Sequence, residues 1–208
     1  MVITKRLNLF VKNLVNQIKN DAITVILFGS LADNTWVKGT SDIDLFIICK
    51  NKRKKELLKR LFYWFMKLEK KYNANLSGVC FGRGQNILVK AFIRFEYYFL
   101  LNVPYYVIEE NEINLNGFAL RDRKARFLSM FGSLKIFGLE LKRNGIVIYG
   151  KKLLSKIKIS PINQIDRLKF LFSLFIIFLL GLLILPVDLQ IGKRHLNKVL
   201  KRYKMITR

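Results

Sequence analysis

The chain has 208 residues, carries a net charge of +24 at pH 7 and is 51% hydrophobic. That apolar content excludes a disordered basic chain, and 12 glycines with 3 prolines exclude a collagen-like or low-complexity chain. Two cysteines are too few for a disulfide scaffold, and the first ten residues lack a secretory apolar core. We therefore expect a folded, cytoplasmic, basic protein whose partner is a polyanion, either nucleic acid, nucleotide or an anionic membrane surface.

The apolar pattern predicts an alternation of helices and strands along most of the chain. Helices are expected where apolar residues recur every three or four positions, at residues 4–19, 50–71 and 118–143, with a helical turn at 31–36. Strands are expected at the short apolar or alternating runs, at residues 23–28, 42–49, 76–81, 87–95 and 97–108. The first two strands should pair as a hairpin, breaks in the third helix are expected at Gly132 and Gly138, and a short apolar run follows at 145–149.

The composition changes near residue 155, which divides the chain into a domain at residues 1–155 and a helical C-terminal region at residues 156–208. A helix beginning near Gln164 includes residues 170–185, which carry no charge. At about 1.5 Å per residue that stretch spans roughly 24 Å, less than the roughly 30 Å hydrocarbon core of a bilayer. We expect a buried or dimerising helix there, with membrane association through residues 170–185 as the alternative. A basic helix is expected at residues 192–204.

Two acidic residues and a Gly-Ser pair lie at the ends of the first two predicted strands. Asp42 and Asp44 are two positions apart in one strand, so their side chains share a face. Adjacent carboxylates repel unless a cation lies between them, and Mg²⁺ takes carboxylate oxygens together with substrate phosphates. Gly29 and Ser30 end the preceding strand, where backbone N–H groups and a hydroxyl can hold phosphate. The pattern indicates metal-assisted phosphoryl or nucleotidyl transfer.

The segment Leu27-Phe28-Gly29-Ser30, followed after eleven residues by Asp42-Ile43-Asp44-Leu45, resembles the DNA polymerase β-like nucleotidyltransferase superfamily. The resemblance implies an α/β (α+β) fold with a small mixed sheet, helices on one face of it and a helical C-terminal region. It also implies that the two aspartates bind two Mg²⁺ ions and that the Gly-Ser pair contacts the triphosphate of an NTP, with ATP as the expected nucleotide. The catalytic core would cover roughly residues 1–110.

Two subfamilies share further segments with the chain. Residues 35–40, 102–106, 121–123 and 136–142 resemble segments of the archaeal-type CCA-adding enzymes. Residues 145–150 are similar to a segment that ends many minimal nucleotidyltransferases, among them the antitoxin type that transfers AMP to a partner protein. The acceptor is therefore either an RNA 3′ end, which the basic charge favours, or a partner protein.

The superfamily usually carries a third carboxylate on a later strand, where it serves as general base. The corresponding positions, near Ser77 in one subfamily and near Leu101 or Asn102 in the other, are not acidic. Glu96 is the nearest acid among the later predicted strands and is our candidate. Without such a residue the chain would be a non-catalytic nucleotide- or RNA-binding module.

Basic residues gather where the helix predicted after Asp44 begins, against the single acid Glu56. We expect them to contact the phosphates of RNA. They are Lys50, Lys52, Arg53, Lys54, Lys55, Lys59 and Arg60. Cys49 and Cys80 lie in apolar strands and are expected to be core thiols.

Overall fold

The structure is a computed structural model that describes residues 2–36, 43–72 and 105–184, with Pro186, Leu189, Leu196 and Leu200. Several of the predicted features lie outside these residues. They are the strands at 76–81 and 87–95, the start of the strand at 97–108, the basic helix at 192–204, and Asp42, Cys80 and Glu96.

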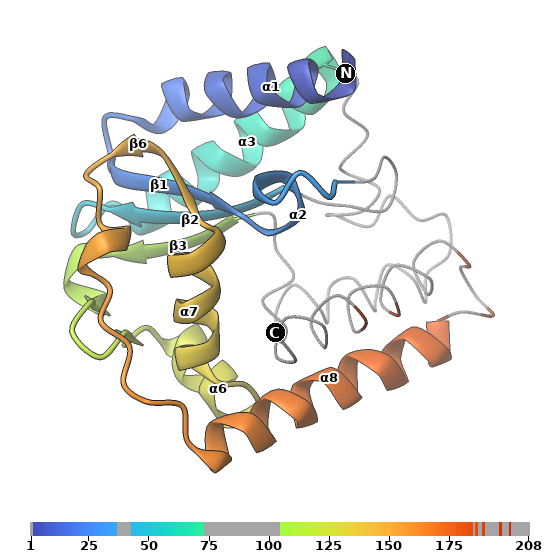
Figure 1. Cartoon of the computed structure of the whole chain (residues 1–208). Helices are drawn as coiled ribbons and strands as arrows, with labels where there is room; N and C mark the ends of the chain where they lie inside the picture. Colours follow the sequence, from blue (N-terminus) through green and yellow to red (C-terminus); the bar gives the residue numbers. More distant parts are fainter. Residues whose placement is uncertain are drawn as a thin grey trace.

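A four-stranded mixed sheet forms the centre of the fold, in the order β3-β2-β1-β6 (Figure 1). β1 (Ala22–Phe28) pairs antiparallel with β2 (Asp44–Cys49), which confirms the predicted hairpin. β3 (Tyr105–Glu109) runs parallel to β2, and β6 (Ile146–Gly150) runs antiparallel to β1. The small mixed sheet is as predicted, and the short run near residue 145 is one of its outer strands.

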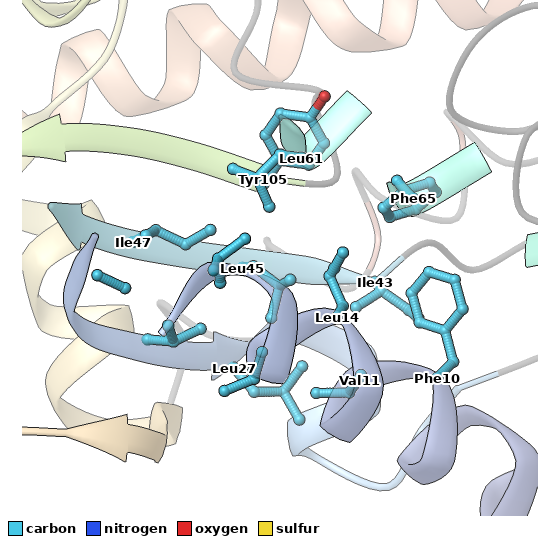
Figure 2. Close-up of a cluster of buried hydrophobic side chains, with 14 of the residues drawn as sticks. Phe10, Val11, Leu14, Leu27, Ile43, Leu45, Ile47, Leu61, Phe65 and Tyr105 are labelled. Atoms are coloured by element: carbon cyan, nitrogen blue, oxygen red, sulfur yellow. The ribbon is translucent and has the colours of Figure 1, made fainter. Parts of the chain in front are cut away.

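Two long helices, α1 (Val2–Ile18) and α3 (Lys54–Tyr72), cover one face of the sheet (Figure 1). Every second residue of the central strands is buried toward them, including Leu27, Leu45 and Ile47. Phe10 of α1 and Phe65 of α3 meet edge to face, with ring centroids 5.1 Å apart. Figure 2 shows how the apolar stripes of the helices meet the period-two pattern of the strands.

The opposite face of the sheet is covered by α7 (Leu134–Asn144), so the expectation of helices on one face only is wrong. The strand residues that alternate with the first set, such as Ile26 and Phe46, are buried on this side. Phe137 of α7 contacts Phe28 and Phe46 at centroid separations of 5.7 and 5.9 Å. The physical reason is that the central strands are apolar at nearly every position, and a strand of that kind needs cover on both faces.

The helical region predicted over residues 118–143 is two helices preceded by a short hairpin. α6 (Arg123–Phe131) ends just before Gly132, where a break was expected. The break expected at Gly138 is wrong, because this residue lies inside α7. A Cβ at Gly138 would overlap the ring of Phe118, so the glycine marks close packing between elements and not a helix end. The short elements around these helices are β4 (Ile113–Asn114), β5 (Ala119–Leu120), η1 (Glu110–Glu112) and η2 (Leu154–Lys156).

The last described helix, α8 (Gln164–Ile184), begins at the predicted residue and contains most of the predicted uncharged stretch. It contacts α6 and α7, and Phe170 and Leu174 are buried against Ile136. Within the described part of the chain, no helix combines the length and apolar content that crossing a bilayer requires.

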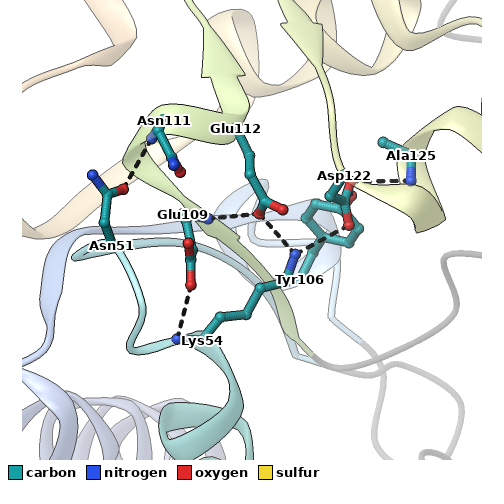
Figure 3. A network of polar contacts seen from close by, with 8 residues as sticks. All are labelled: Asn51, Lys54, Tyr106, Glu109, Asn111, Glu112, Asp122 and Ala125. Atoms are coloured by element: carbon teal, nitrogen blue, oxygen red, sulfur yellow. Dashed lines mark hydrogen bonds and ion pairs between the residues drawn. The ribbon is translucent and has the colours of Figure 1, made fainter.

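A buried polar cluster joins β3, α3 and α6 near the point where β2 and β3 end (Figure 3). Asp122, 6% exposed, accepts hydrogen bonds from the Tyr106 hydroxyl at 2.5 Å and from the backbone N–H of Ala125 at 3.0 Å, which caps α6. Nζ of Lys54 lies 3.2 Å from the other oxygen of Asp122 and 2.9 Å from Glu112. One lysine therefore neutralises two carboxylates that come from different elements.

The electrostatics of this polar cluster keep both donors protonated. Burial alone would lower the pKa of Lys54, but the hydrogen bond to Glu112 and the charge of Asp122 outweigh it and raise that pKa above its ordinary value. Burial, reinforced by the hydrogen bond to Asp122, raises the pKa of Tyr106. Both donors are consequently protonated at neutral pH, and alkali weakens the cluster by deprotonating them.

Replacing Gly138 by alanine should destabilise the fold. An interior helical glycine ordinarily costs about 1 kcal/mol relative to alanine, so helix propensity alone predicts a gain. Overlap with the Phe118 ring should reverse that sign, with a net loss of about 1–2 kcal/mol. Urea denaturation of Gly138→Ala measures the change. Lys142→Ala on the exposed side of the same helix is the control, and a Gly138→Ala protein as stable as that control would contradict the packing role.

Replacing Lys54 by methionine should lower the free energy of unfolding by about 2 kcal/mol at pH 7, because two carboxylates lose a charged donor. The raised folded pKa means that this stabilisation is complete below the ordinary lysine value of 10.5 and is lost as pH rises through the folded value. The difference between wild type and Lys54→Met should therefore narrow in alkali.

Urea denaturation from pH 7 to above pH 10.5 would follow that difference, with Lys55→Met, an exposed neighbour in α3, as the control. A difference independent of pH, or no larger than that of Lys55→Met, would contradict the role of Lys54.

Candidate active site

The end of β1 and the start of β2 meet at a close backbone approach. Phe28 and Asp44 are direct partners across the hairpin, and Gly29, the next residue, has a φ of +70°. A Cβ at Gly29 would overlap the carboxylate of Asp44. Both the positive φ and the contact require glycine, so the main chain at the end of β1 lies directly against a carboxylate.

The short helix α2 (Gly29–Ala32) begins at this glycine and positions Ser30. Leu31 is buried in the core beneath it. The N–H of Asp33 donates to the carbonyl of Gly29 at 3.1 Å, and the N–H of Thr35 donates to the carbonyl of Ser30 at 2.9 Å. Ser30 is thus held at the same end of the sheet as the carboxylate of β2.

Three of the predicted site residues, Gly29, Ser30 and Asp44, are therefore brought together by the fold. Asp42 and Glu96 lie outside the described residues. Asp44 and Phe46 are two apart on β2 and share a face, so the carboxylate lies on the side of the sheet that α7 covers. Carboxylate oxygens are the donors that hard divalent ions prefer, and the missing side chain at Gly29 leaves main chain beside them.

The acids that follow in the described chain gather elsewhere. Glu109 ends β3, and its partner across the ladder is Cys49, at the other end of β2 from Asp44. Glu112 and Asp122 belong to the polar cluster of Figure 3. Among the described residues, His, Cys, Asp and Glu form no group of three that could hold a metal ion.

The buried thiol and tyrosines of the sheet have structural surroundings. Cys49 is fully buried, and burial together with the charge of Glu109 raises the pKa of its thiol to about 11. A thiol with so high a pKa is a poor nucleophile at neutral pH, so the prediction of a core thiol is confirmed. Tyr105 and Tyr106 are likewise buried among the core side chains.

The seven cations predicted to contact RNA are not equivalent. Lys54 is bound in the polar cluster, and Arg60 pairs with Asp21. Arg53 lies 3.0 Å from Glu56 and 3.9 Å from Asp21. Carboxylates of the same protein therefore compensate three of the predicted cations.

The remaining four cations lie on the outside of the molecule. Nζ of Lys50 donates to the carbonyl of Asn20 at 2.8 Å. Lys52, Lys55 and Lys59 are exposed before or along the first turns of α3. Their ammonium groups are at the surface and can contact phosphates there.

The basic surface continues along α3 with exposed aromatic side chains, which the charge pattern of the sequence did not predict. Phe62 and Tyr63 are 50% and 57% exposed. Nζ of Lys67 lies over the rings of Tyr63 and Trp64, at 5.6 and 4.7 Å from their centroids. Spacings of four residues between Lys59, Tyr63 and Lys67 could have shown this stripe. We call Lys55, Lys59, Phe62, Tyr63 and Lys67 the basic–aromatic surface.

The family model of the nucleotidyltransferase domain matches residues 7–97. That range runs from α1 to beyond α3 and contains the Gly29-Ser30 pair together with both aspartates of the Asp42-Ile43-Asp44 segment. Comparison with curated proteins and with solved structures gives no match. Residues 7–97 are therefore similar to the nucleotidyltransferase domain, in line with the resemblance to the polymerase β-like superfamily.

Proposed function

We propose that this protein transfers a nucleoside monophosphate from ATP to a hydroxyl of an RNA 3′ end in a reaction that requires Mg²⁺. Nucleotidyl transfer in general follows from the domain. The close approach of the Gly29 main chain to the Asp44 carboxylate is the observation that carries the finer proposal. In this contact, a turn without a side chain, which a phosphate could approach, lies beside a carboxylate that could bind a hard metal ion.

The proposed roles follow from the chemistry of each side chain. Asp44, with Asp42 two residues earlier, would hold the divalent ions, which when bound neutralise charge on the phosphoryl oxygens. Ser30 and the N–H of Gly29 would bind the triphosphate and so orient the leaving group. The domain match covers all four residues and supports this assignment.

The reaction forms one bond and breaks one. The hydroxyl oxygen of the acceptor bonds to the α-phosphorus of ATP, the bond from that phosphorus to the bridging oxygen breaks, and pyrophosphate leaves with the electron pair. The hydroxyl proton passes to a base, for which we propose Glu96.

RNA is the favoured acceptor because of the basic–aromatic surface. Exposed lysines contact backbone phosphates, and exposed rings stack on unpaired bases, which together suit a single strand. The net charge of +24 points the same way. The surface adds stacking rings to the cations that the sequence indicated.

A partner protein is the second candidate acceptor. The segment Ile146–Gly150 is similar to the end of minimal nucleotidyltransferases, and it is built into the sheet as β6 beside β1. The similarity of this segment is what supports AMP transfer to a protein as the alternative. A degenerate module that binds nucleotide or RNA without catalysis is the third possibility that the assay below must distinguish.

Asp44→Asn should lower nucleotidyl transfer by about 100-fold or more, because an amide cannot neutralise a divalent ion at the site. The assay follows α-³²P-labelled ATP with Mg²⁺ and total RNA or cell lysate. Glu110→Gln, the same change at an exposed position in η1, is the control and should retain full activity. Wild type and Asp44→Asn that are equally silent with all four NTPs would contradict the enzymatic proposal.

The acceptor should be identified by where the label goes. Label in RNA supports the proposal, whereas label in a polypeptide supports the alternative. Lys59→Gln/Tyr63→Ala/Lys67→Gln should raise KM for RNA about 10-fold and leave KM for ATP unchanged, since it removes charge and stacking. Lys151→Gln/Lys152→Gln, exposed after β6, is the charge control, and an equal effect of both variants would contradict a specific acceptor surface.

A further inference from the structure

We propose that α8 docks on an anionic lipid surface through its outward apolar face. Nine large apolar side chains of this helix are between 40% and 70% exposed. They are Ile165, Leu168, Leu171, Phe172, Phe175, Phe178, Leu179, Leu182 and Leu183. Single exposed apolar residues are ordinary on a soluble protein, but a contiguous apolar patch marks an interaction site.

The exposed residues share one side of the helix. At about 100° per residue, all nine fall within an arc of about 140°. The buried residues Phe170, Leu174, Ile177 and Gly181 fall within a separate arc of about 60°. The helix therefore has a narrow buried face, on which Phe170 and Leu174 pack against Ile136 of α7, and a wider exposed apolar face.

Side-chain contacts fix the N-terminal turns of α8 to the rest of the fold. Asp166 accepts hydrogen bonds from Lys135 at 2.8 Å and from the Ser133 hydroxyl at 3.0 Å. Nζ of Lys169 donates to the carbonyl of Ser129 at 2.7 Å. These contacts tie the start of α8 to α6 and α7.

The positive charge of the protein indicates what binds to the apolar face of α8. A second copy would bring another net charge of +24 to the same place, and like charges oppose that association. An anionic lipid surface would instead be attracted. Arg167 is exposed beside the apolar face, and the neighbouring α6 exposes Arg123 and Arg126.

A lipid surface matches both the apolar face and the basic residues beside it, because it offers acyl chains to the first and anionic headgroups to the second. Stable binding to a membrane surface takes two signals, and an apolar helix face with adjoining basic residues supplies both. The Phe and Leu side chains would enter the boundary between headgroups and acyl chains while the arginines contact lipid phosphates. The proposal depends on α8 and the neighbouring arginines and not on the transfer reaction.

Vesicle sedimentation of the nuclease-treated full chain tests the proposal. Wild type should bind vesicles of 70% phosphatidylcholine and 30% phosphatidylserine and should bind pure phosphatidylcholine far less. Leu171→Gln/Phe175→Gln/Leu182→Gln should lower binding to the anionic vesicles at least about 10-fold, because it removes apolar area from the docking face. Leu9→Gln/Phe62→Gln is the matched control, since it removes exposed apolar residues from α1 and α3.

Circular dichroism and thermal denaturation of both variants would show that they fold. Equal vesicle binding by the two folded variants would overturn the proposal, because binding would then be by charge alone. Failure of folded wild type to bind anionic vesicles would overturn it as well. So would a stable dimer in light scattering that the α8 variant alone abolishes, because a second copy would then occupy the face. Transfer activity of the α8 variant is a separate readout that the proposal leaves unchanged.

Discussion

The contact between the Gly29 main chain and the Asp44 carboxylate depends on the register between β1 and β2. Phe28 lies opposite Asp44 in that register, and a slip of one residue would turn the carboxylate to the other face of the sheet. The register is secured by the alternation of buried residues, because one set packs on α1 and α3 and the other on α7. The hydrophobic core thereby fixes the position of a polar side chain at its edge.

The same alternation explains which parts of the fold could be predicted. α1, β1, β2 and α3 carry strong helical or strand patterns and were predicted with small errors in their ends. β6 is only partly buried, so its pattern indicated no sheet partner. Gly138 shows a different limit of prediction from sequence. A glycine that ends a helix and a glycine that makes room for a neighbouring ring, such as that of Phe118, look the same in the sequence. Only the tertiary contact distinguishes the two.

The candidate site divides in a similar way. The Gly-Ser pair and Asp44 are linked by a local hairpin, so short spacing in the sequence was enough to place them together. The ion pairs, in contrast, join residues that are far apart in the sequence. Arg60 meets Asp21 from another element, and Lys54 meets Asp122 from 68 positions away. No spacing rule distinguishes these compensated cations from exposed ones such as Lys59.

The distribution of acidic residues explains why the excess positive charge lies on the surface of the protein. Several of the 14 acids are bound in internal pairs, among them Asp21, Glu112, Asp122 and Asp166. Acids used in this way leave the outer faces basic, and the resulting self-repulsion is relieved when a polyanion binds. The outer face of α3 combines its cations with aromatic rings, which suits bases and phosphates, whereas α8 combines nearby cations with aliphatic and Phe side chains, which suits lipid. One net charge can therefore serve two different anionic surfaces, because the apolar residues beside each group of cations determine what it binds.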